Sequence, residues 1–277
     1  MTLEPRTRED YDARKTEAAH RVLVDVGQVL ASFEDCLVVV GGWVPELLLP
    51  NAEEPHVGSI DIDLALDAEK LNRGRYAELL GLLLNTGRYR MGKESYQLVT
   101  VVDLGDGETP TQVEVDFLAP KEIKLKKNEP KLRQGFRVLQ ADACGNAFGA
   151  PVQKEIEGRT LRGARNTVRI RVASVVDFLI MKSHALGGRD KPKDAYDICY
   201  CLDHYPGGLG DLATSWRSRR AEKDVKRAIE ILREKLSSSE DFGPDQVVEF
   251  FQSPAADTRA MQARRAFELV QKFLDLI

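Results

Sequence analysis

The chain has 277 residues, of which 43% are hydrophobic and 30% charged, with a net charge of -4. This globular composition supports one large domain or two modest ones, and the net charge excludes a global attraction to polyanions, so any contact with nucleic acid must be local. Residues 1–20 are too polar for a signal peptide, and no apolar run has the length of a membrane span. The four cysteines lack zinc-type spacing. We therefore expect a cytoplasmic protein with reduced thiols and no membrane segment.

The first half of the chain alternates helix and strand patterns. Apolar residues at every third or fourth position predict amphipathic helices, and short β-branched runs that end at glycine or turn residues predict strands. The predicted helices cover residues 11–33, 43–49 and 68–86, and the predicted strands cover 36–42, 59–66, 97–104 and 111–118. The turn-rich GDGETP between the last two strands predicts a hairpin.

The second half is dominated by helical patterns, after a stretch with weak periodicity. Residues 119–172 are rich in Lys and Arg and contain candidate strands only near 135–140 and 167–172. We therefore predict an α/β (α+β) chain: residues 1–172 form a mixed sheet flanked by helices, with the N-terminal helix, and residues 173–277 form a helical domain that completes the active site.

Two predicted strands carry carboxylates inside apolar runs. On a strand, residues two apart share a face, so GSIDIDLAL presents Asp61 and Asp63 together, and VEVDFL presents Glu114 and Asp116 together. If the strands are neighbours, these carboxylates converge and repel one another unless cations bind. Oxygen ligands suit Mg²⁺, and two ions could clamp the attacking and leaving oxygens of a phosphoryl displacement. We predict two Mg²⁺ ions, with Mn²⁺ as a substitute.

Either feature alone has a simpler explanation. An Asp-x-Asp strand is more often a solvated sheet face or a single structural cation site, and tight turns use Gly-Gly widely. In VVVGGW, however, Gly41 and Gly42 follow a strand and open a helix, an arrangement that lets backbone N–H groups approach phosphate oxygens.

The combination of VVVGGW, GSIDIDLAL and VEVDFL resembles the DNA polymerase β nucleotidyltransferase superfamily. The resemblance implies the nucleotidyltransferase fold, with Asp61 and Asp63 as metal ligands and Asp116 as the third carboxylate, which completes the site. The spacing between Gly-Gly and Asp-x-Asp is longer than that family's usual spacing, because PNAEEPH (50–56) looks like an insertion.

A second pattern lies in an apolar helix and the short connection that follows it. Lys182 borders the apolar stripe of that helix, and the block RDKPKDAYD, which contains Asp194, begins seven residues later. Considered alone, Lys182 is best explained as a lysine that snorkels at a helix edge. Together with the Asp-x-Asp strand, the pattern resembles the AbiEii-type nucleotidyltransferases, the toxins of type IV toxin–antitoxin systems. The resemblance implies functional roles for Ser59, Asp61, Lys182 and Asp194.

We therefore expect an Mg²⁺-dependent, pyrophosphate-releasing nucleotidyltransferase that moves an NMP from an NTP to an acceptor. The expected catalytic residues are Asp61, Asp63, Asp116, Lys182 and Asp194, and the expected nucleotide-binding residues are Gly41, Gly42, Ser59 and Lys182. The resemblance implies an RNA acceptor, the tRNA 3′ end, and a cognate antitoxin protein as partner.

The basic clusters Lys121–Arg137 and Arg159–Arg171 could contact an RNA backbone. Two alternatives remain open: a small-molecule or protein acceptor, and a degenerate fold that binds nucleotide without catalysis.

Overall fold

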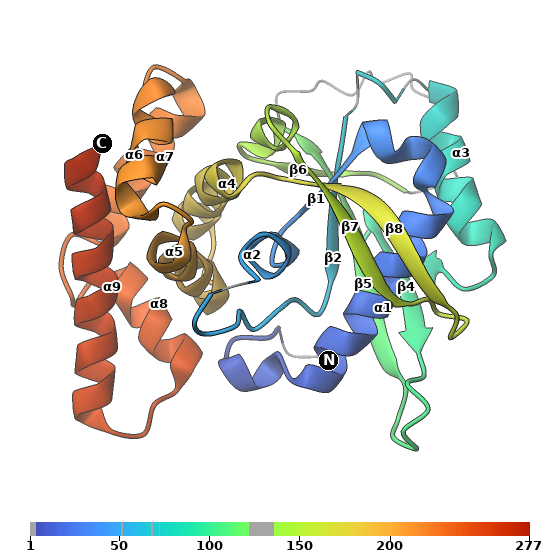
Figure 1. Ribbon diagram of the computed structural model, residues 1–277, viewed down its shortest axis with the longest axis horizontal. Coiled ribbons are helices and arrows are strands. Elements are labelled where there is room, and N and C mark those ends of the chain that lie inside the picture. The colour runs from blue at the N-terminus through green and yellow to red at the C-terminus, as the bar shows by residue number, and fades with distance from the viewer. Residues whose placement is uncertain (1–3, 51, 68, 72, 122–135) are drawn as a thin grey trace. The chain divides into compact units, whose positions relative to one another are not determined.

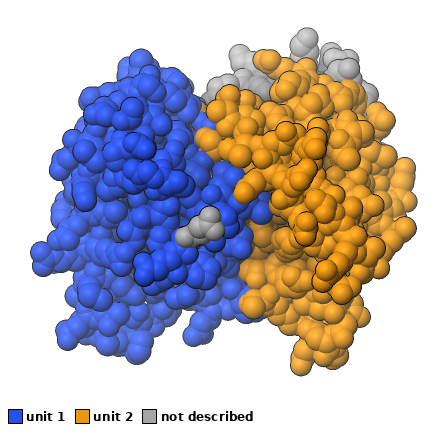
Figure 2. Space-filling view, viewed as in Figure 1, with its two compact units in different colours: residues 1–12, 45–58, 175–277 blue, residues 13–44, 59–174 orange. Residues whose placement is uncertain are grey.

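The computed structural model describes residues 4–50, 52–67, 69–71, 73–121 and 136–277 (Figure 1). Its internal contacts divide the chain into two compact units, which Figure 2 shows in two colours. Unit 1 contains Met1–Asp12, Pro45–Gly58 and Val175–Ile277, and unit 2 contains Ala13–Val44 and Ser59–Ser174. Each unit thus combines segments that are separated along the chain. The single domain boundary at residue 172 remains a prediction.

Unit 2 is built on one mixed sheet with the strand order β3-β4-β5-β2-β1-β8-β7, in which β6 also pairs with β5. The pairs β1–β8, β2–β5 and β5–β6 are parallel and the other pairs are antiparallel. The strands are β1 (Leu37–Val40), β2 (Ile62–Leu66), β3 (Arg90–Met91), β4 (Gln97–Val102), β5 (Thr111–Pro120), β6 (Leu139–Ala141), β7 (Val152–Arg159) and β8 (Arg165–Val172).

Helix α1 (Ala13–Val29) lies against one face of this sheet (Figure 1). Its buried side chains, among them Val22, Leu23 and Val26, recur at helical spacing. Unit 2 also contains α3 (Arg73–Asn85) and the 3₁₀ helices η2 (Ala31–Cys36) and η3 (Cys144–Phe148). Asp25, buried on α1, accepts hydrogen bonds from Tyr89 and Arg88, which satisfies its carboxylate away from water.

Unit 1 is helical. Aromatic side chains form much of its core: Tyr196 stacks on Phe250 at 4.4 Å between ring centroids, and Trp216 packs edge-on against Phe273. Its helices are η1 (Arg8–Asp10), α4 (Val175–Gly188), α5 (Pro192–His204), α6 (Gly208–Ser218), α7 (Lys223–Lys235), α8 (Phe242–Phe251) and α9 (Ala256–Leu276). Helix α2 (Trp43–Leu48) begins in unit 2 and ends in unit 1. No helix in the described ranges has the length and apolar character needed to cross a membrane.

The predicted fold class, a mixed sheet flanked by helices and followed by helices, is confirmed. The strand β7 was not predicted, because its sequence VQKEIEGR is mostly polar and it lies at the edge of the sheet. The helix predicted over residues 11–33 is shorter than expected, since α1 ends at Val29 and a 3₁₀ helix follows.

Candidate active site

Strands β2 and β5 place two of the predicted carboxylates side by side. The strands are parallel neighbours, and their register pairs Asp63 with Asp116. On each strand the alternate residues, such as Leu64 and Phe117, are buried on the opposite face. Asp61, Asp63, Glu114 and Asp116 are called the carboxylate cluster below. All four side chains are partly exposed.

Asp61 does not lie on the strand as predicted, because β2 begins at Ile62 and Asp61 occupies the bend before it. Its place is set by two neighbours instead. The buried Ser59 donates a hydrogen bond from Oγ to Asp61 Oδ1 at 2.6 Å, and Trp43 donates from Nε1 to the Asp61 carbonyl at 2.8 Å. The buried Trp43 thus fixes the backbone of Asp61.

The first glycine of VVVGGW lies directly against Asp63. Strand β1 pairs Val40 with Asp63, and Gly41 follows with a φ of +68°, a left-handed conformation that favours glycine. A Cβ atom on Gly41 would lie only 2.0 Å from Asp63 Oδ2. Gly41 is therefore required for its backbone conformation and for the space that the Asp63 carboxylate occupies. Gly42, the second predicted glycine, is buried beside it.

The charges of the carboxylate cluster act on Asp116. Burial and then the charge of Asp63 raise the pKa of Asp116 to about 7, with smaller contributions from Asp61 and Glu114. One neutral donor opposes this effect: Gln97, opposite Asp116 on β4, donates a hydrogen bond from Nε2 to Asp116 Oδ1 at 3.1 Å. Gln97 is buried and was not among the predicted site residues.

The cluster has the donor chemistry that Mg²⁺ prefers but not a closed protein cage. Within the described ranges, no three His, Cys, Asp or Glu side chains are arranged to hold a metal ion. Mg²⁺ is usually bound by one or two carboxylates together with water and substrate phosphates. The pairing of Asp63 with Asp116 fits that open mode of binding.

A second group of charges lies in unit 1, on α4 and α5. Lys182 Nζ is 2.7 Å from Asp194 Oδ1 and 2.8 Å from Asp197 Oδ2. Arg189 also pairs with Asp194, and Lys193 pairs with Asp197, both at 2.7 Å. We call Lys182, Arg189, Lys193, Asp194 and Asp197 the lysine cluster. The structure thus brings together Lys182 and Asp194, two of the predicted site residues.

Asp197 and His56 are members of this network that the sequence analysis did not assign to the site. His56 Nε2 lies 2.9 Å from Asp197 Oδ1, and both side chains are almost fully buried. Asp197 could have been recognised, because it follows Asp194 by one helical turn and therefore shares its face of α5. His56 could not, since it lies 141 residues from its partner along the chain.

The ion pairs of the lysine cluster keep its members charged. Burial alone would lower the pKa of Lys182, but the carboxylates of Asp194 and Asp197 hold it above its usual value. Burial likewise opposes ionisation of Asp194, yet Lys182 and Arg189 lower its pKa to about 2. The pKa of Asp197 is also held well below its usual value, by Lys182 and Lys193 against the effect of burial. Three cations therefore face two carboxylates.

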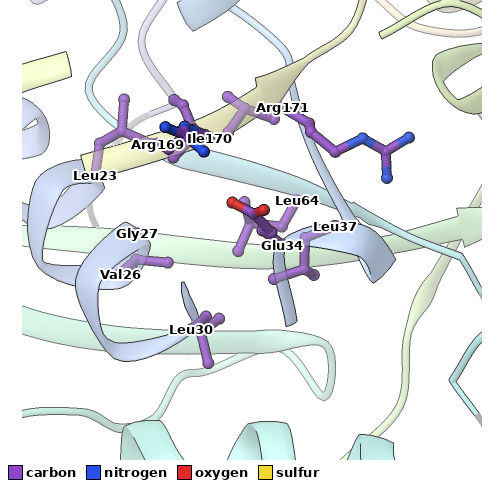
Figure 3. A pocket seen from close by; sticks show the side chains of 11 residues that line it. Leu23, Val26, Gly27, Leu30, Glu34, Leu37, Leu64, Arg169, Ile170 and Arg171 are labelled. Atoms are coloured by element: carbon purple, nitrogen blue, oxygen red, sulfur yellow. The ribbon is translucent and has the colours of Figure 1, made fainter. Parts of the chain in front are cut away.

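A small, partly open pocket of unit 2 is separate from the carboxylate cluster. It has a volume of about 30 Å³, and Leu23 and Leu30 of α1 line it together with Leu64 (Figure 3). Leu64 is the neighbour of Asp63 on β2 and so points to the opposite face of the sheet. This volume is much smaller than that of a typical ligand pocket, so the pocket is not a nucleotide site.

The predicted basic clusters are only partly described. Residues 122–135, which include Lys124, Lys126 and Lys127, lie outside the described residues. In the second cluster, Arg165 and Arg169 are exposed on β8, and Arg169 forms a 3.4 Å ion pair with Glu155 of β7. Arg171 donates a hydrogen bond to the carbonyl of Asp35.

Comparison with known proteins identifies the family of the chain. Residues 21–271 match the family model described as nucleotidyl transferase AbiEii toxin, type IV TA system. Among solved structures, the chain is similar to an antigenic nucleotidyltransferase-like protein from Paracoccidioides brasiliensis, with 13% identity, a TM-score of 0.44, and 79% of this chain and 89% of that chain covered. A search of curated proteins found no match. The chain belongs to the AbiEii family of nucleotidyl transferase toxins of type IV toxin–antitoxin systems.

Proposed function

We propose that this nucleotidyltransferase moves an NMP from an NTP to RNA, with the 3′ end of tRNA as its acceptor, and that it acts as a toxin. The observation that carries the proposal is the register of β2 and β5, which pairs Asp63 with Asp116 while Gly41 leaves the space that Asp63 needs. Family membership supports nucleotidyl transfer. The identity of the acceptor is proposed in addition.

In this proposal Asp61, Asp63 and Asp116 hold two Mg²⁺ ions. When bound, the ions supply charge neutralisation at the triphosphate and a lowered pKa for the acceptor hydroxyl. Ser59 holds the Asp61 carboxylate through its 2.6 Å hydrogen bond, and Gln97 holds Asp116. These two neutral donors orient the carboxylates without adding positive charge that would compete with the ions.

Lys182 is the proposed phosphate contact. Its Nζ is held by two buried carboxylates, Asp194 and Asp197, which keep the amine charged and fix its position. A triphosphate is an anion that such a fixed charge can bind, since lysine binds phosphate as a compact point charge. Asp194 then has a positioning role, because its two oxygens bind Lys182 and Arg189 rather than substrate.

RNA is the proposed acceptor because the exposed arginines of β8 offer contacts to a phosphate backbone, although the chain is acidic as a whole. A terminal ribose also supplies the hydroxyl nucleophile that the reaction needs. If arginines such as Arg165 and Arg169 bind the acceptor, modification of RNA will fall steeply with added salt, whereas NTP binding will change less.

The acceptor is tested by incubating the protein with each α-labelled NTP, Mg²⁺ and total RNA, and then digesting half of each sample with ribonuclease and half with protease. The proposal expects label in a discrete RNA band that only ribonuclease removes. Label that only protease removes, or label in a small molecule, would contradict the RNA acceptor while leaving nucleotidyl transfer intact.

A further inference from the structure

Helix α5 binds the segment 54–58 of unit 1 through a continuous set of hydrogen bonds. Tyr200 donates from its hydroxyl to the Glu54 carbonyl at 2.8 Å, and the Val57 amide donates to the Tyr196 hydroxyl at 3.3 Å. Between these two contacts, the His56 ring stacks on Tyr196 and meets Tyr200 edge-on. The segment is therefore fixed on α5 on both sides of His56.

The hydrogen bonds of His56 define its protonation. The Gly58 amide donates to His56 Nδ1 at 3.0 Å, so Nδ1 carries no proton. The proton is on Nε2, which donates to Asp197 Oδ1 at 2.9 Å. Glu46 approaches Nδ1 only to 4.0 Å, which is beyond hydrogen-bond range. His56 is thus a neutral donor buried among charged groups.

This donor acts on the carboxylate that faces Lys182. Asp197 Oδ1 accepts hydrogen bonds from His56 and Lys193. The other oxygen, Oδ2, lies 2.8 Å from Lys182 Nζ. The Lys182–Asp197 contact has the distance of an ion pair but not the angle of a hydrogen bond, and Oδ2 has no hydrogen-bond partner within the described ranges. The orientation of this carboxylate therefore depends on what binds Oδ1.

We propose that His56 is a positioning residue: by donating to Asp197 it orients the carboxylate that holds Lys182 for the nucleotide. The proposal rests on the proposed function of Lys182. This positioning role differs from a purely local role, in which His56 would only close the turn to Gly58 and so fix the backbone before Ser59. Because the imidazole uses a different nitrogen for each bond, the two roles can be separated.

Three substitutions make the separation. His56→Gln supplies an amide donor that can reach Asp197, whereas His56→Asn supplies an oxygen that can accept from the Gly58 amide two residues on but is too short for Asp197. His56→Ala removes both bonds. His184→Gln is the matched control, because His184 is a unit 1 histidine whose Nε2 bonds only the Asp224 carbonyl in the described contacts.

Two readouts are needed for these variants. The first is kcat and KM for the NTP in the transfer assay. The second is the side-chain ¹⁵N ammonium resonance of Lys182, assigned by its loss in Lys182→Arg, which reports on the ion pair whether or not transfer occurs. We expect His56→Gln to keep kcat/KM within about threefold, and His56→Asn and His56→Ala to lose about tenfold or more, mostly through KM, since a hydrogen bond to a charged group is lost. The ammonium resonance should shift in the same two variants only.

The outcomes either support or overturn the proposal. Equal activity and unshifted resonances for His56→Asn and His56→Gln would show that His56 only closes the local turn to Gly58. Loss in His56→Gln as large as in His56→Ala would show that donation to Asp197 is insufficient. If the wild-type protein transfers no nucleotide, the proposed function fails, and the ammonium resonance alone still decides whether His56 orients the Asp197–Lys182 pair.

Discussion

Asp63 and Asp116 lie opposite one another on the parallel strands β2 and β5. Two carboxylates in this register repel each other, and burial adds to the cost of ionising Asp116. Such a pair lowers the unfolding free energy of the metal-free protein. This loss is expected at a functional site where bound cations offset the repulsion.

Asp116→Asn should stabilise the metal-free protein while abolishing transfer. Burial, and after it Asp63, raises the pKa of Asp116 to about 7, so its ionisation in the folded state disfavours folding increasingly as the pH rises from about 4 to 7. The substitution removes that effect. We expect the Tm in EDTA to rise by a few degrees at pH 8 and by less at pH 5.

Glu108→Gln is the control for this prediction, because Glu108 is an exposed carboxylate in the turn of the same hairpin. Its Tm should change little at either pH. A lower Tm for Asp116→Asn at pH 8, or transfer at the wild-type rate, would contradict the assignment of Asp116 as a strained functional carboxylate.

Gly41→Ala should abolish transfer because its Cβ would lie 2.0 Å from Asp63 Oδ2. The control is Gly105→Ala: Gly105 has a φ of +75°, close to the +68° of Gly41, but open space around it. Both variants should lose about 1–2 kcal/mol of unfolding free energy from backbone strain alone. Only Gly41→Ala should displace Asp63 and lose activity. Equal transfer by the two variants would show that Gly41 serves the turn and not the site.

Lys182→Ala should cost both stability and activity, for separable reasons. Removing one partner from a buried ion-pair network costs about 3–5 kcal/mol of unfolding free energy, whereas loss of a phosphate contact costs roughly two to three decades in rate. Lys182→Met keeps most of the apolar volume of the lysine side chain, and the pairs Arg189–Asp194 and Lys193–Asp197 remain in both variants. Lys182→Met should therefore be more stable than Lys182→Ala in urea unfolding and should remain as inactive. Recovery of activity along with stability would assign Lys182 a structural role.

The acid stability of the protein should depend on His56. Burial, with the nearby charge of Lys193, lowers the pKa of His56 from 6.5 to about 4, against the opposing effect of Asp197. The unfolded chain therefore binds this proton first, and stability is lost as the pH falls from about 6.5 towards 4. At about 1.4 kcal/mol per pH unit the loss approaches about 3 kcal/mol.

Urea unfolding at pH 7 and pH 4.5 checks this prediction. His56→Gln should lose less unfolding free energy between the two pH values than the wild type does. Other ionisable groups around the position, Lys182, Glu46, Tyr196 and Tyr200, are the same in both proteins. His184→Gln controls for the loss of one histidine. The prediction is wrong if the wild type and His56→Gln show the same pH dependence.

Local sequence patterns predicted the elements that carry the site but not all of their contacts. Alternation placed Asp63 and Asp116 on strands, and β2 does pair with β5. The same alternation wrongly placed Asp61 on a strand, because the bonds from Ser59 and Trp43 hold it in a bend. Such side-chain contacts leave no periodic signal.

The lysine cluster shows the other limit of sequence analysis. Lys182 and Asp194 are close along the chain, so a short connection between two helices suffices to predict their contact. Gln97 and His56 act through pairing that only the folded chain creates, either across a hairpin or over a long separation in sequence. No spacing rule identifies them.

The central claim, transfer of a nucleoside monophosphate, is tested most directly by comparing α-labelled and γ-labelled NTP in parallel reactions with Mg²⁺ and total RNA. The account predicts that the α-label becomes attached to an acceptor while the γ-label is released as pyrophosphate, and that neither occurs with Asp63→Ala. Transfer of the γ-label to the acceptor, or binding of NTP with no turnover of either label, would contradict it.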